Sequence, residues 1–480
     1  MLKTLLSSLI LAVTASAAPK VTFLIGPKAP PLDKAAAEQL AGDFKALFDA
    51  ETTVTTTAPA DSTNLVLVGS PLSNPAIKAD AWPKIGEQGI VIQSTPAGLI
   101  VGGGCPPATM WAVAELSHHF GIRHLLSGDL LPVEKPAFKL DGLSIVMEPK
   151  ILKRGWSMFN GIATGAESWG KDEHLALLRQ LVKLKFTHVL LPKKSPPVPL
   201  VAVDGDTGGR KAFAGAKSFP SGDPVPDLTK DAAALGLVPV ALDFVTHSLG
   251  ARAPSVLPQF QPGDLDRRMR SIVKFKSGGF MAGAQMPGDL SAAAYFTSRV
   301  SFDDKITAPQ ALAGLVTPIC GDGVAERVQK GFDLIAQAAK LIETNDPDLG
   351  VPNAQVLKRH LDSKDALPAW ITEAKTHYAG AMNEMYRANT RAREGARSYT
   401  LHLAKRLEFT VHFFTALEAV YASHDAAKRA ESLEAAVEAL YNALNSLADA
   451  ARNNSERGAI ALLNENGLRV LMKALDGAAN

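Results

Sequence analysis

The sequence feature that most constrains the fold lies at residues 151–192. This segment opens with ILKRGWSMFN and closes with THVLLP, two short runs rich in apolar residues. Between them, Leu177, Leu181 and Leu184 recur at helical spacing, which places aliphatic side chains on one face of a helix. A strand, a helix and a strand within about 40 residues predict one βαβ unit. Its two strands should be parallel and joined by a right-handed crossover.

The chain before this unit has the pattern of a smaller α+β domain. Its apolar and β-branched runs are short and predict strands, whereas two longer stretches have amphipathic helical spacing. The expected strands occupy 20–26, 52–57, 64–69, 89–93 and 99–102, and the expected helices occupy 33–48 and 108–120. The last two strands flank a Thr-Pro-Ala-Gly turn and predict a hairpin.

The middle of the chain is too short for a complete (β/α)8 barrel. A long loop rich in Pro, Gly, Ser and Asp is predicted at 193–227, and a third parallel strand at 235–245. Weaker strand candidates lie at 255–260 and 280–286. A full barrel typically needs about 250 residues, whereas 151–300 offers only 150. We therefore expect an incomplete (β/α) barrel or a reduced open α/β layer.

The last third of the chain is predicted to be helical. The expected helices occupy 308–319, 324–343, 366–421, 426–451 and 465–475. The connections between them are short, and short loops between helices imply antiparallel neighbours. The sequence therefore predicts a C-terminal helical bundle.

Four segments follow from these patterns. We predict a signal peptide at 1–17, an α+β domain at 18–145, a truncated (β/α) barrel-like domain at 146–300 and a helical bundle at 301–480. The first segment has a positive charge at Lys3, a short apolar run and the small-residue cleavage site Ala15-Ser16-Ala17. An ordinary first strand is the alternative. The apolar run is too short to span a bilayer, so we expect a secreted or periplasmic protein without a membrane span.

Charge and cysteine content exclude several classes of function. The net charge is +2, and nucleic-acid binding would require a basic domain or stripe. The two cysteines, Cys105 and Cys320, fall in different predicted domains. Two free, mostly buried thiols are favoured, although an exported protein also permits a disulfide. No Cys or His pair has the usual metal-ligand spacing, and the glycine run at 102–104 lacks the spacing of a phosphate loop. We predict no metal and no cofactor, and the oligomeric state stays open.

A family resemblance rests on the order of four stretches near the N-terminus. The stretches LVLVGSPLSNPAI, GIVIQS, LIVGGGCPPATMWAVAELSHHFGIRHLLSGD and EPKILKRGW resemble the small N-terminal domain of α-glucuronidases and β-N-acetylhexosaminidases. The similarity covers about residues 20–190. In those glycoside hydrolases this domain precedes a (β/α)8 barrel and often a helical C-terminal domain. The resemblance implies a carbohydrate ligand and hydrolysis of a glycosidic bond, in a glycan that contains uronic acid or N-acetylhexosamine.

Candidate catalytic residues are the carboxylates near predicted strand ends. Glycoside hydrolysis normally needs two carboxyl groups that flank the scissile bond. Asp243 closes the apolar run VPVAL, and barrel enzymes place catalytic groups at the C-terminal ends of strands. Glu167 lies in the first predicted βα loop, and His247 could line the same mouth as Asp243. The alternative for these residues is ordinary solvated turn chemistry.

Candidate substrate-binding residues lie in the first strand of the βαβ unit. The resemblance implies that Arg154 holds sugar hydroxyls, because a guanidinium can bind two oxygens at once. The alternative is a salt bridge to a buried partner. Trp156, Trp169 or Phe159 could stack on a sugar ring, and core packing is the alternative for each of them.

A polar helix in the bundle offers further basic residues. Glu384, Arg387, Arg391 and Glu394 form one ridge within EMYRANTRAREGAR. One interpretation is ion pairing on a solvated face. The other is that the ridge, continued by His402 and Arg406 among others, packs against the α/β domain and lines its cleft. Arginines there would be natural partners of an acidic sugar.

Three functions are compatible with these patterns. The first is an exported glycosidase. The second is a non-catalytic carbohydrate-binding or scaffold protein with a degenerate barrel, which the scarcity of glutamate in the middle region favours. The third is an exported structural protein without a ligand.

Overall fold

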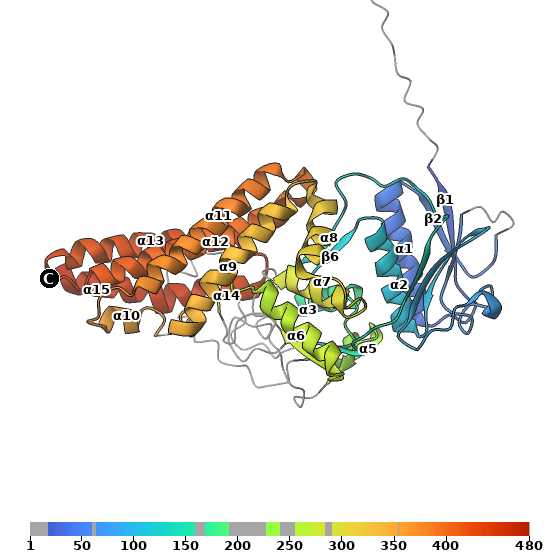
Figure 1. Cartoon of the computed structure of the whole chain (residues 1–480), viewed down its shortest axis with the longest axis horizontal. Coiled ribbons are helices and arrows are strands. Elements are labelled where there is room, and N and C mark those ends of the chain that lie inside the picture. Colours follow the sequence, from blue (N-terminus) through green and yellow to red (C-terminus); the bar gives the residue numbers. More distant parts are fainter. Residues whose placement is uncertain are drawn as a thin grey trace, which may run out of the picture.

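The computed structural model describes residues 18–59, 64–158, 169–191, 227–240, 255–283, 290–353 and 355–479. The predicted signal peptide lies outside these residues. Figure 1 shows an elongated molecule, with the N-terminal sheet at one end, the long C-terminal helices at the other and the central helices between them.

The N-terminal part is a six-stranded mixed sheet covered by two helices. The sheet has the order β2-β1-β3-β5-β4-β8, in which the first four strands are parallel and β4 is antiparallel to both of its neighbours. The strands are β1 (Lys20–Leu24), β2 (Glu51–Thr55), β3 (Leu65–Val68), β4 (Ile90–Thr95), β5 (Gly98–Gly103) and β8 (Ser144–Met147). The helices are α1 (Pro31–Phe48) and α2 (Pro106–His119). The predicted hairpin is confirmed, with Ile90 opposite Gly103.

Aromatic rings fill the space between this sheet and its helices. Phe44 of α1 lies 5.4 Å from Phe23 and 5.8 Å from Phe120, measured between ring centres and with edge-to-face orientation. Such pairs contribute about 0.5–1.5 kcal/mol beyond the area they bury. A two-stranded ribbon that the sequence did not predict, β6 (Arg123–Leu125) with β7 (Gly128–Leu130), follows α2.

The central part is a four-stranded parallel sheet with the order β11-β10-β9-β12. Its elements in chain order are β9 (Lys153–Ser157), α3 (Lys171–Lys183), β10 (His188–Leu190), α5 (Thr229–Ala234), β11 (Val238–Pro239), α6 (Pro262–Lys274), β12 (Gly279–Gly283) and α7 (Ser291–Val300). The predicted βαβ unit is confirmed as β9-α3-β10. No closed barrel is formed by the described residues, in which the last strand, β12, pairs with the first, β9.

One predicted strand is wrong. Residues 255–260 are not part of a sheet, because their backbone groups bond to the C-terminal half of the chain instead. Val256 N donates to Gly350 O at 2.8 Å, and Pro258 O accepts from the Tyr378 hydroxyl at 2.8 Å. Pro258 also has no N–H to offer to a neighbouring strand.

The C-terminal half is a helical bundle, as predicted. Its helices are α8 (Ala308–Cys320), α9 (Ala325–Asn345), α10 (Lys358–Asp362), α11 (Ala369–Arg391), α12 (Glu394–Ala422), α13 (Arg429–Ala450), α14 (Asn454–Leu463) and α15 (Arg469–Ala479). The helix expected at 366–421 is two helices, because the backbone at Ala392 is extended and Arg393 N donates to Cys320 O. Within the described ranges, no helix has the length and apolar character to cross a bilayer. Both cysteines are free thiols, and Cys320 is buried.

Buried charges connect the N-terminal part to the central sheet. Glu115 of α2 lies 2.6 Å from the Arg299 guanidinium of α7 and 2.8 Å from the Lys185 ammonium, which precedes β10. Burial alone would raise the pKa of Glu115, but Lys185 and Arg299 outweigh it and hold that pKa well below its usual range. Burial lowers the pKa of the Lys185 ammonium, so the firmer ion pair is Glu115 with Arg299.

We predict that Glu115→Gln destabilises the fold by about 3–5 kcal/mol, because it leaves buried cations without their counter-charge. The lowered pKa of Glu115 also means that its stabilisation is present at neutral pH and is lost as the pH falls through the acid range. Urea unfolding at several pH values would measure both effects. The matched control is Glu51→Gln, which removes an exposed pair with Lys20 and should cost less than about 1 kcal/mol. Equal losses for the two variants would contradict this interpretation.

Candidate functional site

The candidate site lies at the edge where the parallel strands of the central sheet end. Parallel strands have their C-terminal ends at one edge, and α/β proteins bind ligands there. In the sequence, Glu167 follows β9, and Asp243 and His247 follow β11. All three, and Phe159 as well, lie outside the described residues. The described residues nearby show which helices and side chains surround this edge.

The start of α3 is attached to the start of α14. The Trp169 indole donates to Ser455 Oγ at 2.7 Å. The Glu173 carboxylate accepts from Asn454 N at 3.0 Å and from Asn454 Nδ2 at 2.8 Å. These bonds place the N-terminal end of α14 beside the first βα connection of the central sheet, so the helical bundle forms one wall of this edge.

His174 lies in the first turn of α3, with 0% of its surface exposed. Its ring centre is 5.7 Å from that of Trp169. Neither ring nitrogen has a hydrogen-bond partner among the described residues, and burial lowers the pKa of the imidazole to about 4. His174 is therefore a neutral polar group that the described structure leaves unsatisfied.

A second histidine on the bundle side is paired. His402 of α12 places Nε2 3.7 Å from the Glu456 carboxylate, and its Nδ1 donates to Ala450 O at 3.1 Å. Glu456 is fully buried and also accepts from the backbone N–H of Arg452. One turn along α12, the buried Arg406 donates to Val256 O and so attaches α12 to the segment 255–261.

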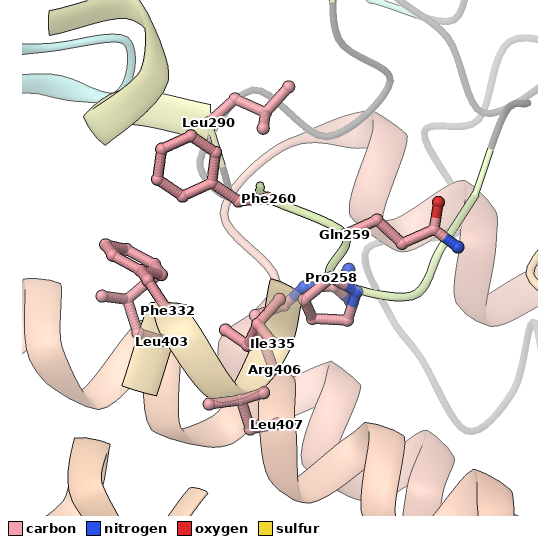
Figure 2. Close-up of a pocket in the computed structure, with 9 residues that line it drawn as sticks. All are labelled: Pro258, Gln259, Phe260, Leu290, Phe332, Ile335, Leu403, Arg406 and Leu407. Atoms are coloured by element: carbon pink, nitrogen blue, oxygen red, sulfur yellow. The ribbon is translucent and has the colours of Figure 1, made fainter. Parts of the chain in front are cut away.

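A small cavity lies where this segment meets the bundle (Figure 2). Its volume is about 20 Å³, enough for one water molecule, which needs roughly 10–15 Å³. Gln259 is 6% exposed, and neither its amide oxygen nor its amide nitrogen has a partner among the described residues. In Figure 2 the Gln259 amide is turned away from the apolar side chains of Phe260, Phe332 and Leu403. A buried amide without partners is costly, and such groups often mark functional sites.

Arg154 is a buried structural link in this structure. Its side chain is 1% exposed. Nε donates to Lys185 O at 2.6 Å, and Nη1 donates to Ile151 O at 2.6 Å and to Gln88 Oε1 at 2.9 Å. The guanidinium also lies over the rings of Trp111 and Phe302, and burial lowers its pKa to about 9. Contact between Arg154 and a sugar stays a prediction.

Trp156 is packed in the core. It is 1% exposed and lies edge-to-face with Phe186 at 5.6 Å between ring centres. Trp169 is also buried. Both tryptophans are therefore placed in the core, which was the alternative to stacking on a sugar ring.

The polar ridge of α11 pairs with α9. Glu384 accepts from Arg327 at 2.8 Å and from Lys330 at 2.9 Å, and Arg387 lies 3.4 Å away on its own helix. Arg391 is exposed. This arrangement matches the ion-pairing interpretation, and substrate contacts by Arg387 or Arg391 stay predictions. The side chain that reaches the segment 255–261, Arg406, comes from the next helix.

Sequence reasoning missed three polar groups at this edge: His174, Gln259 and Glu456. His174 follows the helical spacing of Leu177 and Leu181, so the buried face of α3 could have predicted its burial. Gln259 and Glu456 gave no such signal, because their surroundings are formed by segments distant in sequence. Among the described residues, no group of His, Cys, Asp and Glu side chains is arranged to hold a metal ion.

We predict that Gln259→Leu raises the free energy of unfolding by about 1 kcal/mol, because it removes a buried amide that has no partner among the described residues. Thermal or urea unfolding would measure the change. The control is Gln180→Leu, at another buried glutamine, whose amide nitrogen can donate to Asp129 at 3.0 Å and to Leu125 O at 2.9 Å. That substitution should lower stability. A loss of stability in both variants would show that Gln259 has a structural partner.

Comparison with known proteins supports the fold. The sequence matches no protein-family model and no curated protein. A solved structure that it resembles is a family GH115 4-O-methyl-α-glucuronidase with specificity for decorated arabinogalactans, with a TM-score of 0.64 and 13% identity over 92% of this chain and 78% of that one. Another is a GH138 enzyme targeting pectin rhamnogalacturonan II, with a TM-score of 0.47 and 9% identity over 96% of this chain and 99% of that one. At this identity the α-glucuronidase shows the fold alone, and the chain has a glycoside-hydrolase-like fold.

Proposed function

We propose that this protein is an exported glycosidase that acts at the C-terminal edge of the β11-β10-β9-β12 sheet. Its substrate is a glycan that contains uronic acid or N-acetylhexosamine. The observation that carries the proposal is the convergence of parallel strand ends, in a glycoside-hydrolase-like fold, on an edge walled by α12 and α14. Export follows from the signal-like sequence at 1–17.

Asp243 and Glu167 are the proposed pair of catalytic carboxylates. They follow β11 and β9, which are separated in the sheet by β10 alone. Adjacent strands lie about 4.8 Å apart, so the ends of β9 and β11 are about 10 Å apart. Inverting glycosidases hold their carboxyl groups about 6.5–9.5 Å apart and retaining enzymes about 5–5.5 Å. Two carboxyl groups on these connections would act as general acid and as general base or nucleophile.

Binding of the glycan is assigned to neutral polar groups at the same edge. A glutamine amide both donates and accepts hydrogen bonds, which suits a sugar hydroxyl. Gln259 and the neutral His174 have this capacity unused among the described residues. His247, four residues after Asp243, is proposed to contact the glycan from the same connection.

The competing function is carbohydrate binding without catalysis. The described part of the chain contributes four parallel strands, half the number in a full barrel. Two described carboxylates at the edge, Glu173 and Glu456, already accept hydrogen bonds from protein groups. These observations favour a site that binds carbohydrate without catalysis. Turnover of a substrate is therefore the measurement that decides between the two functions.

We predict that the purified protein releases the leaving group from at least one aryl glycoside in a panel of α- and β-linked glucuronides and N-acetylhexosaminides. Asp243→Asn and Glu167→Gln should each lower turnover by about 100-fold or more, because general acid or base catalysis contributes about 10²–10⁴-fold. Asp204→Asn, a change of the same kind at a position between β10 and α5 in the sequence, is the control and should keep its activity.

Other outcomes separate the alternatives. Binding on a glycan array without turnover of any substrate would support the carbohydrate-binding protein and refute the glycosidase. Neither binding nor turnover would refute both. If the Asp243→Asn and Glu167→Gln variants still turn over the substrate, the glycosidase proposal stands and the assignment of these two catalytic residues is refuted.

A further inference from the structure

A surface groove lies along α6, away from the edge described above. Its volume is about 500 Å³, and its walls include Asp264, Arg267, Arg268, Ser271 and Phe275. Ligand pockets commonly measure about 300–1,000 Å³. Phe275 and Ser277 belong to the turn that leads into β12, so this groove is near the N-terminal end of that strand, whereas the candidate site is at the C-terminal ends.

Phe275 presents its ring to solvent at one end of the groove. It is 70% exposed and has the most exposed aromatic ring among the described residues. Its position is well defined, because Phe275 N donates to Ser271 O at 2.9 Å and Ser277 N donates to Ile272 O at 3.1 Å. Between these bonds Lys276 has a φ of 49°, which turns the chain sharply. The ring therefore sits on an ordered turn.

The groove lies along a basic stretch of the chain. Residues 264–277 contain five basic and two acidic residues, a net charge of +3, whereas the whole chain has +2. The rest of the chain therefore carries a net charge of −1. Arg267 and Arg268 share the carboxylate of Asp264, at 2.8 Å and 2.5 Å. The Arg267 side chain is 78% exposed, and the Lys274 ammonium lies 5.4 Å from the Phe275 ring centre.

We propose that this groove is an accessory binding site for an acidic polysaccharide. The flat apolar side of a sugar ring would lie on Phe275, and a uronate carboxylate would pair with the exposed Arg267. A guanidinium binds a carboxylate through two parallel hydrogen bonds. Phe275 and Arg267 are not among the proposed catalytic or glycan-binding residues, so this inference does not depend on the proposed glycosidase activity.

The test is affinity electrophoresis of the full-length protein in gels that contain polygalacturonic acid or uncharged dextran. We predict retardation by the acidic polymer and none by dextran. Phe275→Ala should weaken binding about tenfold, through lost ring contact. Arg267→Glu should weaken it by a similar factor at low salt and by less at high salt, since exposed charges are screened.

Two control variants match these changes elsewhere on the surface. Leu72→Ala removes another exposed apolar side chain, which is 96% exposed, and Lys34→Glu reverses a charge that is largely exposed. Both should bind polygalacturonic acid like the unmodified protein. All four variants should unfold at similar temperatures and should turn over a small aryl substrate at the unmodified rate, which separates this site from the glycosidase proposal.

Several results would overturn the proposal. They are equal retardation by dextran, no retardation by polygalacturonic acid, or equal weakening in the control variants. Tighter binding to anionic phosphatidylserine vesicles than to the polymer would assign the groove to a membrane surface instead.

Discussion

The orientation of the central sheet depends on a chain of buried cations at its junction with the N-terminal part. Arg154 lies in β9, the strand that pairs with both β10 and β12, and its Nε donates to Lys185 O. Lys185 in turn reaches Glu115 of α2, which also binds Arg299 of α7. Buried charges are costly unless they are paired. The N-terminal part and the central sheet therefore cannot easily slide past each other at this junction. The junction thereby fixes the direction of all four parallel strands.

The helical bundle then supplies the wall at the other end of those strands. The bonds from Asn454 to Glu173 and from Ser455 to Trp169 join α14 to the start of α3. Arg406 joins α12 to the segment after β11. The strand ends are thus enclosed between elements about 100 to 300 residues apart in sequence. The ridge of α11, although richer in arginine, faces α9 and solvent instead.

Local sequence patterns predicted the helices and strands themselves better than they predicted what those helices and strands contact. The spacing of Leu177, Leu181 and Leu184 was enough to predict α3 and its flanking strands, because periodicity depends only on neighbouring residues. The segment 255–260 looked like a strand by composition, yet its backbone bonds to Gly350 and Tyr378. Arg154 could be expected to hold oxygens, but no local pattern could show that these are backbone carbonyls. The unsatisfied amide of Gln259 is likewise a property of the assembled structure.

The distribution of carboxylates decides where the chemistry can occur. At the described part of the edge, Glu173 caps α3 and binds Asn454, and Glu456 binds His402 and the backbone of Arg452. Both carboxylates are therefore already engaged by protein groups. In the proposed function, the general acid is assigned to the connections that follow the strands, where Asp243 and Glu167 each lie within ten residues of a strand end. On this proposal, the walls of the edge orient the glycan, and residues of those two connections carry out the proton transfers.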